Sequence, residues 1–186
     1  MKQQNSYWVF GYGSLIWKPG FAYERAVPAL LPGAHRSLCI YSHRHRGTPE
    51  RPGLVFGLMP GGSCRGMAFE IAPDRWDGVL CYLREREMDR GVYREAQRAV
   101  RLAGGDGEVR ALAFMVDVRH AQYAGRLALA EQLRLVRAGL GESGPNVEYV
   151  LATARHLEQL GINDKALRAL VRALDGTDLP VVADSA

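Results

Sequence analysis

Short β-rich segments, each bounded by glycine, proline or polar clusters, follow one another along the first two-thirds of this chain. Such segments are typical of strands. They are Tyr7–Phe10, Ser37–Ser42, Leu54–Met59, Gly66–Ile71, Arg94–Leu102 and Val109–Val118. The last two flank Ala103-Gly104-Gly105-Asp106-Gly107, which is a strong signal for a hairpin turn. Six strands in 186 residues predict a small barrel or a strongly bent sheet.

The last third of the chain has a helical pattern instead. Leu127–Ala138 is rich in leucine, alanine and arginine at helical spacing. Asn146 is suited to cap a second helix, which Gly161 would end. Asn163 is suited to cap a third helix that runs through Leu174.

Composition places the chain among globular proteins of one domain. Hydrophobic residues make up 47% and charged residues 24% of the sequence, and both values are ordinary. No apolar run approaches the ~20 residues that span a bilayer, and the polar amino end is unlike a signal peptide. We therefore expect a single domain over residues 1–176, a loose tail over 177–186, a cytoplasmic location and no membrane partner.

Cysteines, histidines and charges argue against several classes of site. Cys39, Cys64 and Cys81 lack CxxC spacing, which predicts a reducing compartment and neither a zinc cluster nor a disulfide framework. Cys39 and Cys81 stand in apolar stretches, where core residues are expected. No third ligand with sensible spacing follows His43 and His45, so we expect no metal. The arginines are spread along the chain, so no electrostatic footprint for nucleic acid is evident.

The strand Tyr7–Phe10 runs directly into a turn, Val9-Phe10-Gly11-Tyr12-Gly13-Ser14-Leu15. Glycine permits positive φ and close approach of the backbone to a ligand, and successive N–H groups in such a turn can cradle a carboxylate, a phosphate or an oxyanion. Ser14 adds a hydroxyl and Tyr12 a wall with a polar tip. The alternative is an ordinary β-turn whose glycines serve only the bend.

Two familiar motifs do not fit this turn. Ser14 lacks the G-x-S-x-G order of a nucleophile elbow, and no triad can be assembled around it. The pair Gly11 and Gly13 lacks the third glycine of the dinucleotide fingerprint and is not followed by an evident helix.

One helix interrupts the strands, over about Asp74–Met88, and Asp74 is suited to cap it. Its apolar positions are Trp76, Leu80 and Leu83, spaced by four and three residues. Four residues further stands Glu87, which at about 100° per residue lies roughly 20° from Trp76 on the core-facing stripe.

A carboxylate aimed at an apolar interior, as we predict for Glu87, must be paired, protonated or used. Burial would raise its pKa toward the range of a useful general acid or base. The two arginines of the segment, Arg84 and Arg86, fall on the flanks of the helix. The alternative is that Glu87 sits in a frayed last turn and pairs with a nearby arginine such as Arg90 or Arg94.

Four separated segments, in chain order, resemble the ChaC-like family of glutathione-specific γ-glutamylcyclotransferases. Val9–Pro19 is similar to the family's opening signature nearly residue for residue, and His45–Gly53 is similar to its basic loop. Tyr82–Glu87 resembles the Tyr-Leu-x-x-Arg-Glu segment, and Ser143–Tyr149 resembles the carboxy-terminal signature. Four motifs in order are far more specific than any one of them.

The resemblance implies an α+β fold, γ-glutamylcyclotransferase-like, with a small mixed β-barrel of about six strands and flanking helices. It also implies a lyase without a cofactor that cleaves the small molecule glutathione to 5-oxoproline and cysteinylglycine. The final glutamate of the third motif is the family's catalytic residue, which corresponds to Glu87. Tyr93 matches a tyrosine of the family, while Val92 stands where glycine is more usual. Arg46 and Arg51 are our candidates for binding the distal carboxylate of the substrate.

Two other interpretations remain open. One is a cyclotransferase that acts on other γ-glutamyl amines or dipeptides. The other is a basic module that binds nucleic acid or an acidic partner, for which the net charge of +4 is the indication. The sequence leaves the oligomeric state open.

Overall fold

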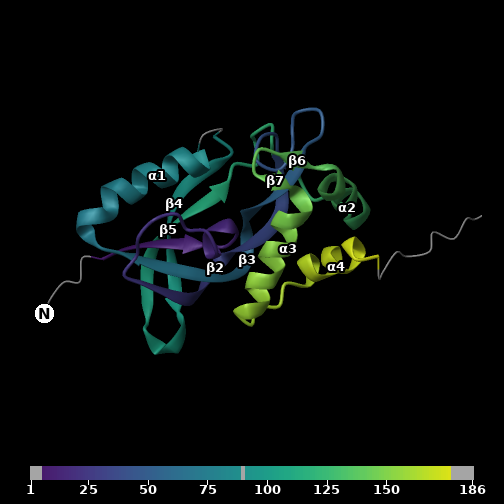
Figure 1. The fold of residues 1–186 in the computed structure, drawn as a ribbon. Helices are drawn as coiled ribbons and strands as arrows, with labels where there is room; N and C mark the ends of the chain where they lie inside the picture. The colour runs from purple at the N-terminus through teal and green to yellow at the C-terminus, as the bar shows by residue number, and fades with distance from the viewer. Residues whose placement is uncertain (1–5, 89–90, 177–186) are drawn as a thin grey trace, which may run out of the picture. The chain divides into compact units, whose positions relative to one another are not determined.

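The computed structural model describes residues 6–88 and 91–176, which fall into two compact units (Figure 1). The barrel unit comprises residues up to Tyr41 together with Val55–Gly125, and the helical unit comprises Ser42–Leu54 together with the residues from Arg126 onward. The expected loose tail over 177–186 lies outside the described residues. The single-domain expectation stays a prediction.

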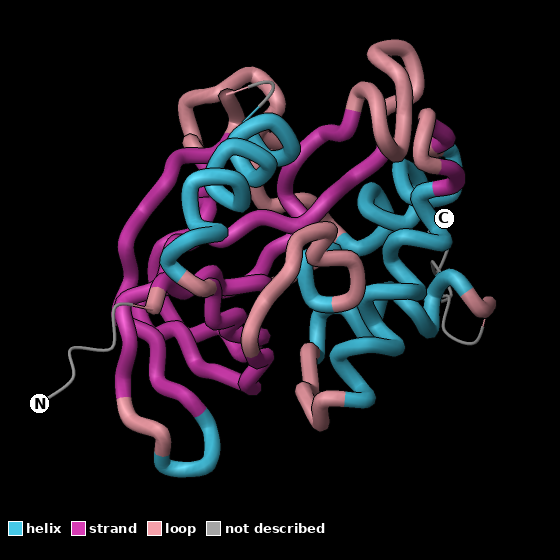
Figure 2. The backbone as a smooth tube through the Cα atoms, turned by 60° about the vertical axis from the view of Figure 1, so that its left-hand side comes forward, coloured by secondary structure: helices cyan, strands magenta, loops and turns pink. Residues whose placement is uncertain are grey.

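Five strands form a closed barrel in the described part of the chain (Figure 2). They are β1 (Tyr7–Gly11), β2 (Arg25–Ser42), β3 (Gly53–Ile71), β4 (Tyr93–Leu102) and β5 (Glu108–Val116). The barrel order is β1-β3-β2-β4-β5, with an additional pairing between β3 and β5. β1 is antiparallel to β3 and parallel to β5, so the barrel is mixed as expected.

Two strands are longer than the sequence predicted, and because one of them unites two predicted strands, the barrel has five strands rather than six. Leu54–Met59 and Gly66–Ile71 are parts of the single strand β3, and β2 begins at Arg25 rather than at Ser37. The glycines between Leu54–Met59 and Gly66–Ile71, which suggested a break, lie in a bend of β3, where Gly61 has φ +92°. Glycine adopts positive φ without steric penalty, so the chain can turn there while the strand continues. The predicted hairpin is confirmed, with β4 and β5 paired from Tyr93↔Val116 to Arg101↔Glu108.

The predicted helix between the strands is confirmed as α1 (Trp76–Met88), preceded by a 3-10 turn, η2 (Pro73–Arg75). Asp74 therefore lies inside this turn rather than capping α1. Val79 and Leu83 are buried in the barrel unit's core. Trp76 stacks on Tyr7 of β1 with the ring centroids 4.5 Å apart. The apolar stripe thus attaches α1 to the barrel and fixes which residues of its last turn face inward.

The helical unit contains three helices and a two-stranded ribbon in the described residues. These are α2 (Leu129–Ala138), β6 (Leu140–Gly141), β7 (Gly144–Pro145), α3 (Asn146–Gln159) and α4 (Lys165–Leu174). As expected, Gly161 follows the end of α3, with φ +65°. None of the described helices is long and apolar enough to cross a membrane.

Two predicted helix caps are wrong. Asn146 is the first residue of α3 rather than its cap, because its buried side-chain amide is bonded to the backbone of Leu54 instead. Asp164 rather than Asn163 caps α4, with its Oδ1 accepting a hydrogen bond from the backbone N–H of Leu167 at 3.1 Å. The Asn146 prediction failed because local spacing cannot show a long-range partner such as Leu54, whereas the α4 cap was misplaced by one residue.

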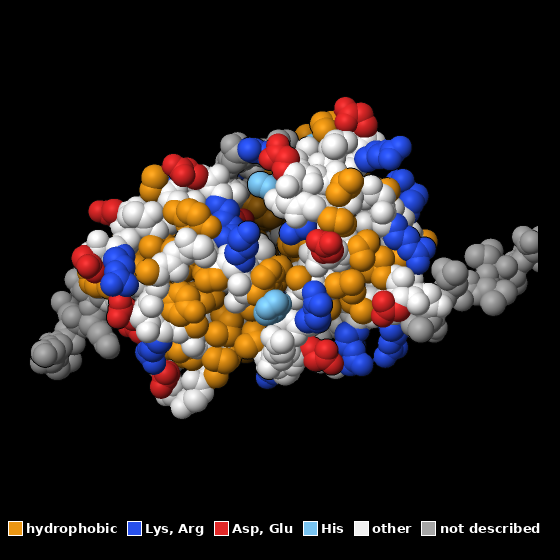
Figure 3. All heavy atoms as spheres, viewed as in Figure 1, with side chains coloured by type: hydrophobic (Ala, Val, Ile, Leu, Met, Phe, Trp, Pro, Cys, Tyr) orange, Lys and Arg blue, Asp and Glu red, His pale blue; other side chains and the backbone are white. Residues whose placement is uncertain are grey.

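The sequence predicted the burial of one cysteine correctly and that of another wrongly. Cys39 is buried as expected, and burial raises the pKa of its thiol to about 11. Cys64 is also buried, but Cys81 is exposed on α1, where its position between apolar neighbours had suggested a core residue. On the face drawn in Figure 3, basic and acidic side chains mix over much of the surface, and several basic side chains lie next to one another along its right-hand edge.

Candidate active site

The glycine turn follows β1 and leads into one turn of 3-10 helix, η1 (Ser14–Ile16). Neither Gly11 nor Gly13 has a positive φ, contrary to the conformational role expected for them. Gly11 is required for space instead: a Cβ there would lie 3.0 Å from Cε2 of Phe69 and 3.1 Å from Cβ of Leu15. The turn is therefore pressed closely against the barrel, and a three-residue 3-10 helix follows it rather than the α-helix of a dinucleotide-binding motif.

The side chains of this turn form a wall with polar tips. Tyr12 is buried, and its hydroxyl donates a hydrogen bond to the carbonyl of Phe114 in β5 at 3.2 Å. Its own carbonyl accepts from Nε of Arg36 at 2.5 Å. Val9, Phe10 and Leu15 are buried in the core, so a ligand could meet these three residues only through their backbone, whereas Ser14 also offers its hydroxyl.

Glu87 projects from the last turn of α1 and is largely buried, with 16% of its side chain exposed. Burial raises the pKa of this carboxyl, and the adjacent guanidinium of Arg86 opposes the increase. The inward orientation that the helical spacing predicted is therefore confirmed. The alternative, pairing with a nearby arginine in the last turn, also holds in its general form, but the partner is Arg86. Arg94 pairs with Asp117 instead, and Arg90 lies outside the described residues.

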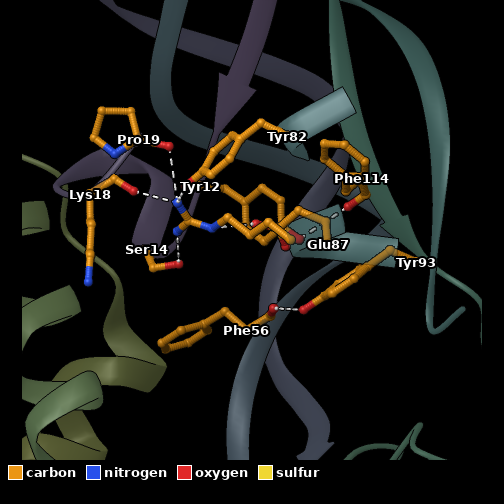
Figure 4. A network of polar contacts seen from close by, with 10 residues as sticks. Tyr12, Ser14, Lys18, Pro19, Phe56, Tyr82, Glu87, Tyr93 and Phe114 are labelled. Carbon is orange, nitrogen blue, oxygen red and sulfur yellow. Dashed lines mark hydrogen bonds and ion pairs between the residues drawn. The ribbon is translucent and has the colours of Figure 1, made fainter. Parts of the chain in front are cut away.

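Arg86 connects the carboxylate of Glu87 to the Ser14 hydroxyl of the glycine turn, and Figure 4 labels both of these partners. Its Nε lies 3.1 Å from Oε1 of Glu87, and its Nη2 donates to Oγ of Ser14 at 2.9 Å. Its Nη1 donates to the carbonyls of Lys18 at 2.6 Å and Pro19 at 3.0 Å. One guanidinium therefore contacts the catalytic candidate and both ends of the segment that contains η1.

Sequence reasoning placed Arg86 on the flank of α1 and gave it no role. That position is correct, but the flank faces η1, and the helical pattern alone cannot tell which flank does so. Two signals were available: its place directly before the inward-facing Glu87, and its match to the arginine of the Tyr-Leu-x-x-Arg-Glu segment.

Tyr93 begins β4 and lies in the same group of side chains as Tyr12 and Glu87 (Figure 4). It is buried, and its hydroxyl donates to the carbonyl of Phe56 in β3 at 2.9 Å. Val92, just before it, is also buried, so the departure from the family pattern at this position is accommodated as a core side chain.

Arg46, a predicted substrate ligand, braces the loop of the helical unit that contains it. Its Nη1 donates to the carbonyls of Ser143 at 2.6 Å and Pro145 at 3.2 Å, and its guanidinium lies 5.4 Å from the ring centroid of Tyr149. The backbone is crowded beside it, because a Cβ at Gly53 would lie 2.1 Å from the carbonyl oxygen of Arg46.

Arg51, the second predicted ligand for the distal carboxylate, is exposed in the same loop. Its backbone N–H donates to Oγ1 of Thr48 at 3.2 Å, and its carbonyl accepts from the Thr48 N–H at 3.0 Å. The carboxylate-binding role of Arg46 and Arg51 stays a prediction. Within the described residues, no three His, Cys, Asp or Glu side chains gather in a way that could hold a metal ion.

Comparison with known proteins gives one consistent family. Residues 7–176 match the family model described as ChaC-like protein. A protein of Escherichia coli (strain K12) named glutathione-specific gamma-glutamylcyclotransferase is 32% identical over 164 residues, which are 88% of this chain and 71% of that protein. The Homo sapiens glutathione-specific gamma-glutamylcyclotransferase 1 is 33% identical over 181 residues, covering 93% of this chain and 80% of that protein.

The solved structures agree at the level of the fold. A crystal structure of a yeast γ-glutamyl cyclotransferase specific to glutathione superposes with a TM-score of 0.84 at 24% identity. The superposition covers 92% of this chain and 96% of the yeast chain.

Proposed function

Because the chain belongs to the ChaC-like protein family, we propose that it cleaves glutathione to 5-oxoproline and cysteinylglycine. Relatives named for this activity are 32–33% identical over most of the chain, which supports the substrate and the reaction. The single structural observation that carries the mechanism is the buried carboxylate of Glu87, connected through Arg86 to the Ser14 hydroxyl of the glycine turn.

The reaction needs orientation more than an external nucleophile. The α-amine of the γ-glutamyl group attacks the γ-carbonyl of the same residue, a five-membered lactam closes, and the amide bond to the cysteinyl nitrogen breaks. A nucleophile that is already tethered and correctly oriented can be worth on the order of 7–11 kcal/mol. The protein has to hold the γ-glutamyl group in the folded conformation that brings the α-amine nitrogen close to the γ-carbonyl carbon.

Proton transfer is the role we assign to Glu87. The α-ammonium must lose one proton before it attacks and another as the lactam closes. The departing cysteinyl nitrogen must gain one proton to leave as an amine, and the other proton passes to solvent. A carboxylate whose pKa is raised by burial is a stronger base than an ordinary one, and after accepting a proton from the attacking nitrogen it is the acid that protonates the departing nitrogen. One residue thus serves both steps and returns to its starting state.

The turn Val9–Leu15 would hold the γ-glutamyl end, with its backbone N–H groups directed at the α-carboxylate or at the oxyanion that develops on the γ-carbonyl. Ser14 is then a hydrogen-bonding wall rather than a nucleophile, because the substrate supplies its own nucleophile. Tyr12 and Tyr93 would close the sides of this site. Their hydroxyls donate to backbone carbonyls, which holds both rings in place.

The distal carboxylate of glutathione is the group for which Arg46 and Arg51 are proposed, on the chemistry of arginine alone. Arg51→Gln should raise KM for glutathione by about 10- to 100-fold, as expected when a charge-assisted hydrogen bond worth ~1.5–3 kcal/mol is lost, and should leave kcat near the wild-type value. An unchanged KM would remove Arg51 from the site.

The test of the activity is incubation of the purified protein with glutathione and identification of the products by mass spectrometry. Wild-type protein should release 5-oxoproline and cysteinylglycine, and Glu87→Gln should lower kcat on the order of 10²–10⁴-fold with an unchanged circular dichroism spectrum. Full activity in Glu87→Gln would overturn the mechanism. Parallel assays with γ-glutamyl amines and dipeptides, compared by kcat/KM, test the alternative substrates.

A further inference from the structure

All three nitrogen atoms of the Arg86 guanidinium have hydrogen-bond or ion-pair partners. Nη1 donates to two carbonyls, of Lys18 and Pro19, and also to the hydroxyl of Tyr82 at 3.0 Å. Nη2 and Nε then serve Ser14 and Glu87. These acceptors come from α1 itself and from the segment that follows β1, so a single planar group joins two elements.

Arg84 provides the contrast on the same helix. Its side chain is 54% exposed, and it makes a bidentate pair with Glu95 of β4, with Nε at 2.6 Å and Nη2 at 3.0 Å. Arg84 therefore ties α1 to the barrel without touching the glycine turn or Glu87. Because Arg84 already attaches α1 to the barrel, attachment of the helix alone does not explain why Arg86 contacts Glu87 and Ser14.

The Tyr82 hydroxyl, which accepts a hydrogen bond from Arg86, occupies the space that a side chain at position 20 would need. A Cβ at Gly20 would lie 2.0 Å from the Tyr82 hydroxyl oxygen, and Gly20 has φ +77°, which a side chain rarely permits. The Tyr82 ring therefore packs against bare backbone, with the Arg86 guanidinium 6.0 Å from its centroid. Gly20, Tyr82 and Arg86 form a supporting chain behind Glu87.

In the described residues, Arg86 supplies the charge and the hydrogen bond that act on the ionisation of Glu87. The hydroxyls of Tyr82, Tyr12 and Tyr93 also lie near this end of α1, and each takes part in a hydrogen bond with a group other than Glu87 (Figure 4). Removing Arg86 would leave the burial of Glu87 unopposed and free its carboxylate to rotate away from the turn.

We propose that Arg86 is a positioning residue of the reaction, which fixes the Glu87 carboxylate and the Ser14 hydroxyl relative to each other through one guanidinium. This role rests on the proposed function. Lysine is a poor replacement, because a single ammonium cannot reproduce the planar fork that reaches Ser14, Glu87 and two backbone carbonyls at once. A displacement of about 1 Å in a catalytic group can lower a rate on the order of 10²-fold.

The test compares Arg86→Gln, Arg86→Lys and the matched control Arg84→Gln on glutathione, with kcat, KM and the pH dependence of kcat. Arg86→Gln should lower kcat on the order of 10²-fold and move the acidic limb of the profile to higher pH. Arg86→Lys keeps the positive charge, so the acidic limb of its pH profile should stay near the wild-type position, while its kcat should still be reduced. Arg84→Gln should keep wild-type kcat and the wild-type limb.

Wild-type kcat and an unmoved limb in folded Arg86→Gln would overturn the role. If Arg86→Gln does not fold, Arg86→Lys decides, and wild-type kcat in that variant would overturn it as well. The proposed function fails separately, if wild-type protein releases no 5-oxoproline. In that case an NMR titration of the Glu87 carboxyl still tests Arg86, because Arg86→Gln should raise the pKa of Glu87, and an unchanged titration would contradict the contact.

Discussion

Arg86 in the barrel unit and Arg46 in the helical unit brace their loops in the same way. Each directs Nη1 at two backbone carbonyls, and each guanidinium lies near a tyrosine ring, at 6.0 Å for Arg86 and 5.4 Å for Arg46. The carbonyls belong to Lys18 and Pro19 for Arg86, and to Ser143 and Pro145 for Arg46.

What separates the two arginines is their acidic neighbour. Arg86 contacts the buried carboxylate of Glu87 at 3.1 Å, whereas the carboxylate of Glu148 acts on Arg46 only as a nearby charge. Burial lowers the pKa of Arg46, and its hydrogen bonds serve the loop. The same device therefore stabilises a loop in one unit and sets the position of a titratable group in the other, which the residue type alone does not reveal.

The helical unit should respond to substitution mainly in stability. The Asn146 amide donates to the Leu54 carbonyl at 2.8 Å and accepts from the Leu54 N–H at 2.6 Å, both buried. Asn146→Ala leaves both backbone groups without this partner, so we expect a loss of about 2–4 kcal/mol in the free energy of unfolding, measured by chemical denaturation. The control Asn163→Ala, at an exposed position, should change it by less than about 0.5 kcal/mol. Equal losses in the free energy of unfolding for Asn146→Ala and Asn163→Ala would contradict the stabilising role of the Asn146 amide.

The barrel unit should respond in activity when the support behind Arg86 is disturbed. Gly20→Ala introduces a Cβ into the space of the Tyr82 hydroxyl at a position with positive φ, so kcat on glutathione should fall by about 10-fold. Gly105→Ala is the matched control, since Gly105 has φ +86° and open space around it. It should lose about 1 kcal/mol of stability and keep wild-type kcat. Similar losses of kcat in both variants would break the contrast between the two regions.

Glu87 should lower the stability of the protein at neutral pH, unlike an ordinary surface carboxylate. Its pKa is raised in the folded state above the ordinary value of 4.5, so the folded protein binds more protons between 4.5 and the raised value. Wild-type stability therefore decreases as the pH rises through that window. Glu87→Gln should raise Tm at neutral pH by a few degrees, about 2–4 °C per kcal/mol, and the gain should shrink toward pH 4.5. A lower Tm for Glu87→Gln at neutral pH would contradict the desolvation of this carboxylate.

Local patterns in the sequence predicted the parts of the site that depend on one element. The spacing from Trp76 to Glu87 predicted an inward carboxylate, because the helical period alone sets which residues share a face. The glycine cluster 103–107 predicted the hairpin, because turns of this kind depend on their own residues.

Features that depend on contacts between distant segments could not be predicted in this way. Which flank of α1 meets the turn depends on how the helix packs on the barrel, so Arg86 was missed. The amide of Asn146 binds Leu54, 92 residues away, where local spacing suggested a helix cap. The two longest strands continue through glycines that resemble breaks in a short window, and only the closed barrel requires them to continue.

The measurement that tests the central role of Glu87 most directly is its own titration. Carbon-13 NMR of glutamate-labelled protein, with Glu87→Gln to assign the signal, gives the pKa of this carboxyl for comparison with the acidic limb of kcat/KM for glutathione. We expect a carboxyl that titrates above the ordinary value of 4.5 and coincides with that limb. A Glu87 that titrates at or below 4.5, or a limb that Glu87 does not follow, would contradict its assignment as the group that carries the proton.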